Sequence, residues 1–493
     1  MHQITISIDP VLLADHAAEI TWAWRTLLTG IGYAWCESDD PAAACDIAYS
    51  ADPNFRPQAR IWLRAEPARW RTPATLRLAG VGAHGDWAVP QYAEQPDDQS
   101  FIVTAEQQVR IGRDVLFDFF WLTTGQEEAS FNKNKHGYLD LADSPYQANL
   151  ALRRAMASGI GVGLERALML RSVPPPLPRW PHGRRAAACG THDVDYPEVV
   201  RWLEPLRILA RQGVGGLRAA AEVAGGRRNH WRFAEWMRAE ERFGLRSAFY
   251  FVARKGSLIE YAAGTPDSFY DIRAPQFREL FARLRDAGFE IGMHASYRAY
   301  QSTARFAAEK QALEYASGGS ILGNRHHYWH LDPHDPEATL LIHEKIGLLY
   351  DTSLFHDRYV GWRRASCWPF FPFHQGERRA LKTLQIPTAW MDDQAFGARH
   401  CNPGEPADIL RGLVDRVAAQ GGVMCANIHD YVYDDTLFPG WSKLYLALLD
   451  DLSARGTFWL ATPAQIARHW IDRATALERA SHGLGRPIAQ GAA

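Results

Sequence analysis

Short apolar runs alternate with helical segments over more than half of this chain, from residue 186 to residue 475. Seven of these runs are typical of buried strands and cover residues 186–191, 247–252, 289–293, 348–354, 382–386, 422–428 and 457–460. Repeated strand–helix units predict a parallel sheet, and about seven of them suit a barrel. We therefore predict an α/β fold whose larger domain is a distorted (β/α)7-type barrel over residues 186–475.

The chain before residue 174 predicts a smaller α/β domain. Residues 4–8 alternate polar and apolar like a strand, and residues 12–28 carry apolar side chains at helical spacing. A proline cluster then begins at Pro174, and it favours extended backbone that pairs with neither helix nor sheet. We expect an N-terminal domain at 1–173, a linker at 174–185 and a flexible tail at 476–493.

Length and charge exclude some partners and leave others open. A chain of 493 residues is longer than one hydrophobic core usually fills, so we expect two or three domains. The formal charge of -2 gives no electrostatic reason to expect nucleic acid. The start lacks the basic end and apolar run of a secretory signal, and no apolar stretch is long enough for a membrane span. We expect a cytoplasmic protein and predict no oligomeric state.

Two carboxylates follow the first strand of the predicted barrel. Asp193 and Asp195 are two residues apart, so in extended backbone their side chains face the same way. Two close carboxylates are costly to bury unless a cation or an arginine compensates them. A solvated loop with a helix cap is the alternative. Their position at the carboxyl end of an apolar strand, where barrel enzymes carry their active sites, favours a functional pair.

Three further segments carry side chains suited to metal-assisted hydrolysis. His294 ends another apolar run, where a neutral imidazole can bind zinc or a similar metal, although such a histidine can equally belong to the core. Arg325 and His327 offer a guanidinium for a carboxylate and an imidazole for a metal, with a surface loop as the alternative. His429 has the intrinsic pKa of a proton donor that works near neutrality.

These segments resemble the motifs of the polysaccharide deacetylases, the family-four carbohydrate esterases. The resemblance covers residues 186–475 and is carried by Thr-His-Asp-Val-Asp at 191–195, Glu-Ile-Gly-Met-His at 290–294, Arg-His-His-Tyr at 325–328 and Asn-Ile-His-Asp at 427–430. Tyr-Asp-Thr-Ser-Leu at 350–354 and Ile-Pro-Thr-Ala-Trp-Met-Asp at 386–392 resemble a subgroup found with polysaccharide biosynthesis proteins. The segment from Phe119 to Gly137 resembles the extra N-terminal domain of that subgroup.

The resemblance implies a role for each residue of the candidate site. Asp193 corresponds to the general base and Asp195 to the metal-binding aspartate, and these two assignments can be exchanged. His294 corresponds to the first metal histidine, and Arg325 to the arginine that orients the base. Tyr328 corresponds to the tyrosine whose backbone amide supports the oxyanion on the substrate, and His429 to the general acid. Asp351 is expected to tune His429.

One position departs from the family pattern. The second metal histidine should stand four residues after His294, but Arg298 stands there, and arginine stays protonated and cannot bind a metal. We therefore predict His327 as the third ligand of a divalent metal ion, with zinc as the expected metal.

The resulting hypothesis is a metal-dependent deacetylase of an N-acetylated sugar or polysaccharide precursor. Arg298 motivates one alternative, a degenerate carbohydrate-binding protein on the same fold. A second alternative is a hydrolase of a non-sugar amide or cyclic imide. Bound metal together with acetate release would separate the deacetylase from the binding protein.

Overall fold

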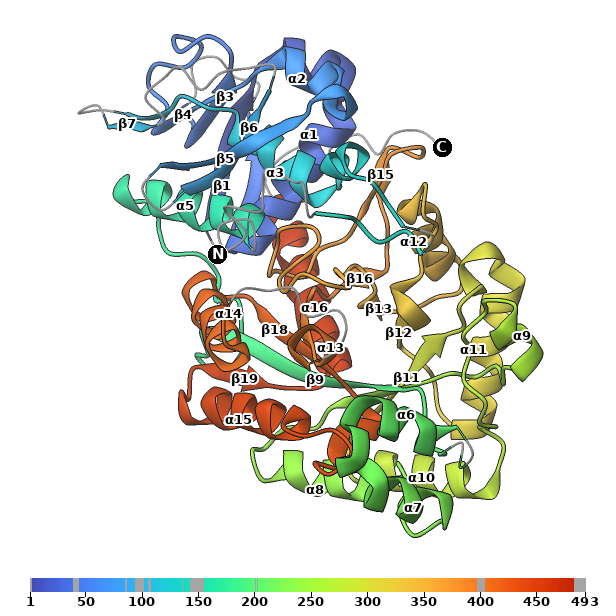
Figure 1. The fold of residues 1–493 in the computed structure, drawn as a ribbon. Coiled ribbons are helices and arrows are strands. Elements are labelled where there is room, and N and C mark those ends of the chain that lie inside the picture. The colour runs from blue at the N-terminus through green and yellow to red at the C-terminus, as the bar shows by residue number, and fades with distance from the viewer. Residues whose placement is uncertain are drawn as a thin grey trace.

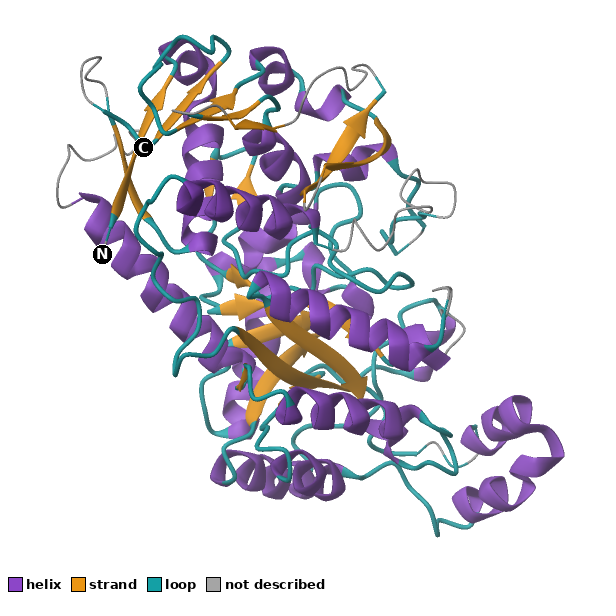
Figure 2. Cartoon of the chain, turned by 90° about the vertical axis from the view of Figure 1, so that its left-hand side faces the viewer, coloured by secondary structure: helices purple, strands orange, loops and turns teal. Residues whose placement is uncertain are grey.

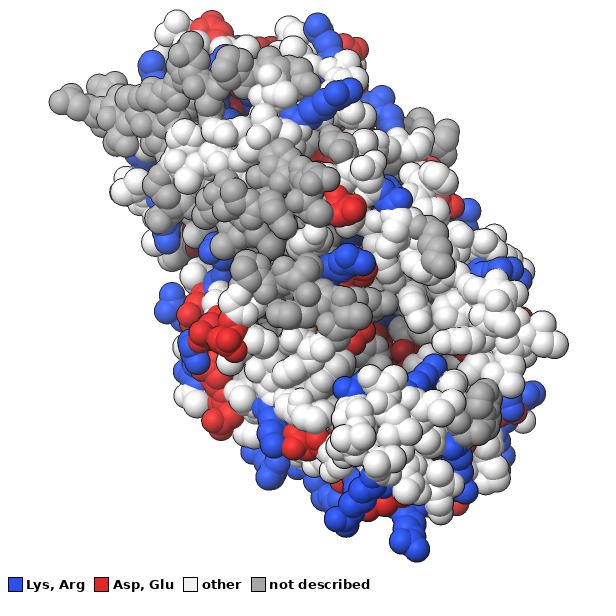
Figure 3. All heavy atoms as spheres, viewed as in Figure 1, with Lys and Arg blue, Asp and Glu red and all other residues white. Residues whose placement is uncertain are grey.

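A computed structural model describes the chain at residues 2–38, 44–84, 87–93, 102–104, 108–134, 136–141, 155–199, 201, 203–396 and 404–482. Two sheets organise these residues, one in the N-terminal part and one after residue 185. Figure 1 shows the first sheet, in blue, above the second, and Figure 2 shows helices packed around both groups of strands. Lys, Arg, Asp and Glu side chains are interspersed over the face drawn in Figure 3.

The first sheet has six strands in the order β2-β1-β3-β4-β8-β7. All of its pairs are parallel except β7 with β8. Its strands are β1 (Gln3–Ile8), β2 (Ala34–Glu37), β3 (Ile47–Ser50), β4 (Ile61–Arg64), β7 (Ile102–Thr104) and β8 (Val109–Ile111). An antiparallel pair, β5 (Leu78–His84) with β6 (Trp87–Tyr92), lies outside this sheet. The strand expected at 4–8 is therefore confirmed within β1.

Four helices accompany the first sheet: α1 (Pro10–Ile31), α2 (Pro67–Arg71), α3 (Val115–Thr123) and α5 (Met156–Leu170). Helix α1 confirms the helix expected at 12–28. The Asp9 side chain caps it by accepting a hydrogen bond from the Val11 amide, and Gly32 ends it at φ 119°. Every residue of α3 is buried, as its apolar sequence indicates.

The second sheet has nine strands, and all of its pairs are parallel. The strands are β9 (Ala186–Val194), β10 (Ala248–Phe251), β11 (Glu290–Ala295), β12 (Gly323–His326), β13 (Tyr350–Asp351), β16 (Leu384–Gln385), β17 (Thr388–Met391), β18 (Val423–His429) and β19 (Phe458–Leu460). All nine residues of β9 are buried, which explains its continuous apolar run. The parallel sheet predicted from the sequence is confirmed.

The order of the strands gives this sheet a barrel-like course. Along the sheet the strands follow β16-β13-β12-β11-β10-β9-β18-β17, and β19 pairs with the start of β9. Strand β16 pairs with β13, and β17, which begins three residues after β16 ends, pairs with β18. The chain around Pro387 therefore links the two ends of the strand order.

Helices α6 to α16 connect and cover these strands. They are α6 (Glu204–Gln212), α7 (Leu217–Ala224), α8 (Phe233–Glu241), α9 (Leu258–Ala262), α10 (Pro275–Asp286), α11 (Thr303–Ser317), α12 (Pro336–Lys345), α13 (Asp393–Phe396), α14 (Pro406–Gln420), α15 (Trp441–Ala454) and α16 (Pro463–His482). A short antiparallel pair, β14 (Phe373–His374) with β15 (Arg379–Ala380), lies outside the barrel-like sheet.

The segments expected as a linker and a flexible tail are both packed against the rest of the molecule in part. The proline segment 174–185 contains no helix or strand, as expected, but its Trp180 is 1% exposed and packs against Trp470 of α16. Helix α16 extends to His482, so residues 476–482 of the expected flexible tail are helical. The apolar side chain of Leu477 explains this difference, because it is buried and holds the helix against the molecule. The remainder of that tail lies outside the described residues.

None of the described helices combines the length and the apolar character needed to span a lipid bilayer.

Candidate metal centre

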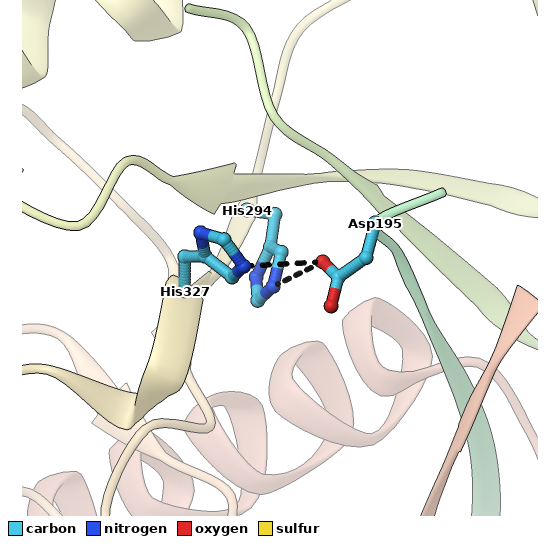
Figure 4. Close-up of side chains that lie close together, drawn as sticks. All are labelled: Asp195, His294 and His327. Atoms are coloured by element: carbon cyan, nitrogen blue, oxygen red, sulfur yellow. Dashed lines mark ion pairs between the residues drawn. The ribbon is translucent and has the colours of Figure 1, made fainter. Parts of the chain in front are cut away.

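One carboxylate and two imidazoles converge at the carboxyl edge of the parallel sheet. Asp195 follows the last residue of β9, His294 lies on β11, and His327 follows the last residue of β12. Asp195 Oδ1 is 3.3 Å from His294 Nε2 and 3.5 Å from His327 Nε2. Figure 4 shows both rings directed at this carboxylate, and the three ligand atoms lie within 4.8 Å of one another. Parallel strands bring these groups together because their carboxyl ends share one edge of the sheet.

The unsatisfied atoms of this group fit a divalent cation. Asp195 Oδ1 and His327 Nε2 are buried, and neither has a hydrogen-bond partner among the described residues. Buried polar atoms without partners are rare because leaving them unpaired is costly. One carboxylate oxygen with two imidazole nitrogens is a frequent donor set for zinc. The three residues therefore fit a metal ion of this kind.

The rings of both histidines are oriented through their second nitrogen. His294 Nδ1 lies 2.8 Å from the Arg325 carbonyl oxygen, to which it can only donate, so Nε2 is left as an acceptor that faces the site. His327 Nδ1 lies 3.4 Å from Asp267 Oδ1, and Asp267 is buried. Metal-binding histidines usually hydrogen-bond a carbonyl or a carboxylate in this way, which fixes the ring.

The buried carboxylates and imidazoles of this group shift one another's pKa values. Burial alone would raise the pKa of Asp195, but the two histidines outweigh it and hold the pKa well below its usual value. Burial would lower the pKa of His327, but Asp195 and Asp267 raise it to about 9. Without an ion the His327 ring therefore carries a proton at neutral pH. A cation would take the place of that proton, so its binding would release a proton.

Asp193 has different partners from Asp195, although the two residues lie on the same strand end. Arg325 Nη1 donates to Asp193 Oδ1 at 2.9 Å, and Asn427 Nδ2 donates to Asp193 Oδ2 at 2.8 Å. Arg325 Nη1 also donates to Asn427 Oδ1 at 2.7 Å. Burial would raise the pKa of Asp193, but the Arg325 guanidinium outweighs it and keeps the pKa below its usual value. Asp193 is therefore an ionised carboxylate held in a fixed orientation.

His429 lies near Asp195 and is held by Asp392. Its Nε2 is 3.7 Å from Asp195 Oδ2, and its Nδ1 is 2.8 Å from Asp392 Oδ1. The His429 backbone amide donates to Asp392 Oδ2 at 2.8 Å, so one carboxylate binds both the ring and the backbone. Burial would lower the pKa of His429, but Asp392 outweighs it and raises the pKa well above its usual value. Asp392 therefore favours the protonated form of the His429 ring.

The turn after His327 has an uncommon backbone conformation. Tyr328 and Trp329 have φ angles of 55° and 52°, in the left-handed region that residues other than glycine rarely adopt. The Trp329 ring packs against the Arg325 guanidinium, whose centre lies 4.8 Å from the ring centroid. This turn therefore joins the candidate ligand His327 to the arginine that holds Asp193.

The expected role of Asp351 needs a correction. Asp351 was expected to tune His429, but its carboxylate accepts hydrogen bonds from Asn324 Nδ2 at 2.8 Å and from the Ser353 hydroxyl at 2.7 Å. Asp392 occupies the position beside the His429 ring instead. The physical reason is the strand order, because β17, which leads to Asp392, pairs with the His429 strand β18, whereas the Asp351 strand β13 lies between β12 and β16.

Asp392 and Asn427 are the residues that sequence reasoning missed. Both stand in motifs that were recognised, Asp392 at the end of 386–392 and Asn427 at the start of 427–430. Asn427 also lies two positions before His429 on one strand, so its side chain shares the face of that histidine. That spacing could have identified Asn427. Arg298, which replaces the family histidine, is exposed and lies outside the ligand group.

Fold and site together define an α/β protein with a candidate divalent-cation centre at the carboxyl edge of a barrel-like parallel sheet. Among solved structures the chain is similar to a Mycobacterium smegmatis protein assigned to the polysaccharide deacetylases, with 19% identity, a TM-score of 0.39, and coverage of 63% of this chain and 96% of the other. The allantoinase Puue has 18% identity and a TM-score of 0.40, with coverage of 61% and 94%.

A Pseudomonas aeruginosa PAO1 protein assigned to the polysaccharide deacetylases is similar at 17% identity and a TM-score of 0.40, with coverage of 60% of this chain and 95% of the other. No family model matches the chain, and no curated protein matches it.

Proposed function

We propose that this protein is a metal-dependent hydrolase that removes an N-acetyl group from a sugar or a polysaccharide precursor. The observation that carries the proposal is the convergence of Asp195, His294 and His327, with Asp193 Oδ2 4.0 Å from His294 Nε2 and His429 Nε2 3.7 Å from Asp195 Oδ2. Amide hydrolysis needs a base for water, a stabiliser for the oxyanion and an acid for the leaving nitrogen. These residues can meet all three needs.

The metal would be held by Asp195, His294 and His327. A divalent cation, with zinc as the expected identity, supplies Lewis acidity toward the scissile carbonyl and lowers the pKa of a water molecule. The buried oxygen of Asp195 and the buried nitrogen of His327 that have no hydrogen-bond partner support this assignment.

The protein side chains would carry the proton transfers. Asp193, ionised and oriented by Arg325 and Asn427, accepts a proton from the attacking water. The Tyr328 backbone amide donates a hydrogen bond to the oxyanion that develops on the substrate, an interaction worth about 3 to 4 kcal/mol in other enzymes. His429, protonated because Asp392 raises its pKa, gives its proton to the leaving nitrogen. The products are acetate and a free amine.

The central test is the metal content of the purified protein. We expect wild type to bind zinc and His327→Ala to lose at least about tenfold in zinc affinity, because one of three ligands is gone. His330→Ala is a matched control, since His330 is also buried and lies three residues away, but it hydrogen-bonds the Tyr297 carbonyl and is not in the ligand group. Unchanged zinc binding in His327→Ala, or equal losses in both variants, would contradict the proposal.

The degenerate binding protein remains the second candidate because Arg298 stands where the family has a metal histidine. Incubation of the zinc-loaded wild type with an N-acetylhexosamine oligomer separates the two. Release of acetate supports the hydrolase, whereas bound metal and bound sugar without acetate would favour the binding protein. Ring opening of a cyclic imide to a product with one amide and one carboxylate, without acetate release from the sugar, would favour the hydrolase of a non-sugar amide or cyclic imide.

A further inference from the structure

A segment of the N-terminal part reaches the turn that follows His327. We call residues 131–134 and 136–141 the strap. Lys133 Nζ donates to the Pro333 carbonyl at 3.1 Å, and an isolated bridge joins Lys133 to Leu139. Gly137, at φ +74°, lies so close to Pro333 that a Cβ atom on it would be 3.0 Å from the Pro333 Cα. The strap is therefore in direct contact with the loop after β12.

The start of the strap is anchored by a buried ion pair. Glu128 accepts hydrogen bonds from Arg363 at 2.9 Å and 2.7 Å, and both side chains are 5% exposed. A two-bond arginine–carboxylate pair of this kind fixes geometry as well as supplying energy. The strap thus begins from a fixed point on the chain segment that precedes β14 and β16.

Tyr138 contacts the metal-site turn through both its hydroxyl and its ring. Its hydroxyl donates a hydrogen bond to the Tyr328 carbonyl oxygen. Its ring is 6% exposed and packs in a cluster with Trp329, Phe355 and Met391. The hydroxyl and the ring therefore hold two consecutive residues of the turn.

These two residues, Tyr328 and Trp329, are the ones with left-handed backbone, a conformation that persists only where surrounding contacts enforce it. The turn they form carries His327 immediately before it and the Tyr328 amide within it. A change at Tyr138 would thus alter the position of a candidate ligand and of the candidate oxyanion donor together.

We infer that Tyr138 is a positioning residue of the metal centre, so that the N-terminal part of the chain completes the active site of the barrel. The inference deepens the proposed function and rests on it. In physical terms, the Tyr138 hydroxyl fixes the peptide between Tyr328 and Trp329, and this restrains the turn that begins directly after His327. Residues outside the ligand set that orient a ligand in this way typically change metal affinity about 10- to 100-fold when they are replaced.

The test compares two tyrosines that make the same bond in different places. Tyr138→Phe keeps the ring and removes the hydroxyl bond to the Tyr328 carbonyl. Tyr33→Phe is the matched control, because Tyr33 is 1% exposed and its hydroxyl donates to the Pro174 carbonyl at 2.8 Å, outside the candidate site. Zinc affinity is measured by competition with a chromophoric chelator. The visible absorption of the cobalt(II)-loaded proteins reports the coordination geometry, which a general loss of stability would not change.

We expect Tyr138→Phe to weaken zinc binding about tenfold and to alter the cobalt spectrum, while Tyr33→Phe leaves both at the wild-type values. In the acetate assay kcat should fall more than KM rises, because the oxyanion donor is displaced. Wild-type zinc affinity and cobalt spectrum in Tyr138→Phe would overturn the inference and leave the proposed function standing. Equal changes in the two variants would also overturn it. A wild-type protein that binds neither zinc nor cobalt would overturn both.

Discussion

Asp193 and Asp195 differ in their surroundings although they are the same residue type on one strand end. Asp193 is bound by a guanidinium and an amide, so it is ionised and oriented. Asp195 faces two imidazoles and leaves one buried oxygen without a hydrogen bond. The first environment suits a base and the second suits a metal ligand. Of the two assignments that the sequence left open, these contacts favour Asp193 as the base.

Asp392, whose carboxylate lies beside the His429 ring, is expected to set the pKa of that ring. Replacing Asp392 by Asn removes the charge that raises the pKa of His429, so the pKa should fall. A general acid must be protonated to work, so the basic limb of the kcat/KM profile should move to lower pH. We expect a loss of about 10- to 100-fold in kcat/KM at neutral pH.

The measurement is the pH profile of acetate release. Asp393→Asn serves as the control, since it removes the same charge one residue away and leaves the bond between Asp392 and the His429 ring in place. An unchanged basic limb in Asp392→Asn, or an equal shift in both variants, would show that Asp392 does not set the protonation of His429.

At the scale of elements, the turn between α3 and the 3-10 helix Gln126–Ser130 links the N-terminal part to the barrel-like part. Gly125 forms this turn at φ +68°, and a Cβ atom there would lie 1.1 Å from Arg364 Nη1. Arg364 is buried, and its Nη2 donates to Glu337 Oε1 at 2.9 Å, so its guanidinium is held in place. The absence of a side chain at residue 125 therefore makes room for an ion pair.

Gly125→Ala should lower the urea midpoint of unfolding more than Gly183→Ala does. Gly183 has nearly the same φ, +66°, but an added Cβ would meet no atom within 4 Å. In the control, only the left-handed backbone conformation of the new alanine lowers the free energy of unfolding, by about 1 to 2 kcal/mol. In Gly125→Ala, overpacking against Arg364 lowers it by about 1 to 3 kcal/mol more. Equal midpoints for the two variants would mean that Arg364 moves aside at little cost.

Across the whole molecule, the last turn of helix α16 is hydrogen-bonded to the first sheet. In α16, the Ser481 carbonyl accepts from Gln3 Nε2 at 3.0 Å, and the Ser481 hydroxyl oxygen accepts from the Trp35 amide at 3.0 Å. Leu477 is 2% exposed. One hydrophobic core also extends without interruption from Ile4 to Trp470. The division at residues 174–185 therefore remains a prediction about domains, while the packing across it is continuous.

A chain that ends after Thr475 should melt below a chain that ends after His482. The shorter chain loses the burial of Leu477, about 1.5 to 3 kcal/mol, and two hydrogen bonds of about 1 kcal/mol each. For a protein of this size these losses correspond to a fall in Tm of about 3 to 5 °C. Thermal unfolding followed by circular dichroism checks this. Equal Tm values would show that the last turns of α16 do not stabilise the first sheet.

The parallel sheet and the strand ends that carry the chemistry could be predicted from the amino-acid sequence alone. Both follow from short-range patterns, because a buried parallel strand needs a run of apolar residues, and the polar residues that follow it emerge at one edge. Strands β12 and β17 were not among the expected strands. In β12, the residues Asn324, Arg325 and His326 give no apolar run. Side chains of this kind are buried only when partners from other strands satisfy them.

The packing of the whole chain selects those partners. The pairing of Asp392 with His429, of Asn427 with Asp193 and of Tyr138 with Tyr328 joins residues 37, 234 and 190 positions apart. No local pattern encodes such a choice, because several carboxylates follow strands of one parallel sheet and strand order alone decides which of them reaches a given histidine. Sequence motifs named the groups present at the site, and the folding of the sheet and the strap assigned each group its neighbour.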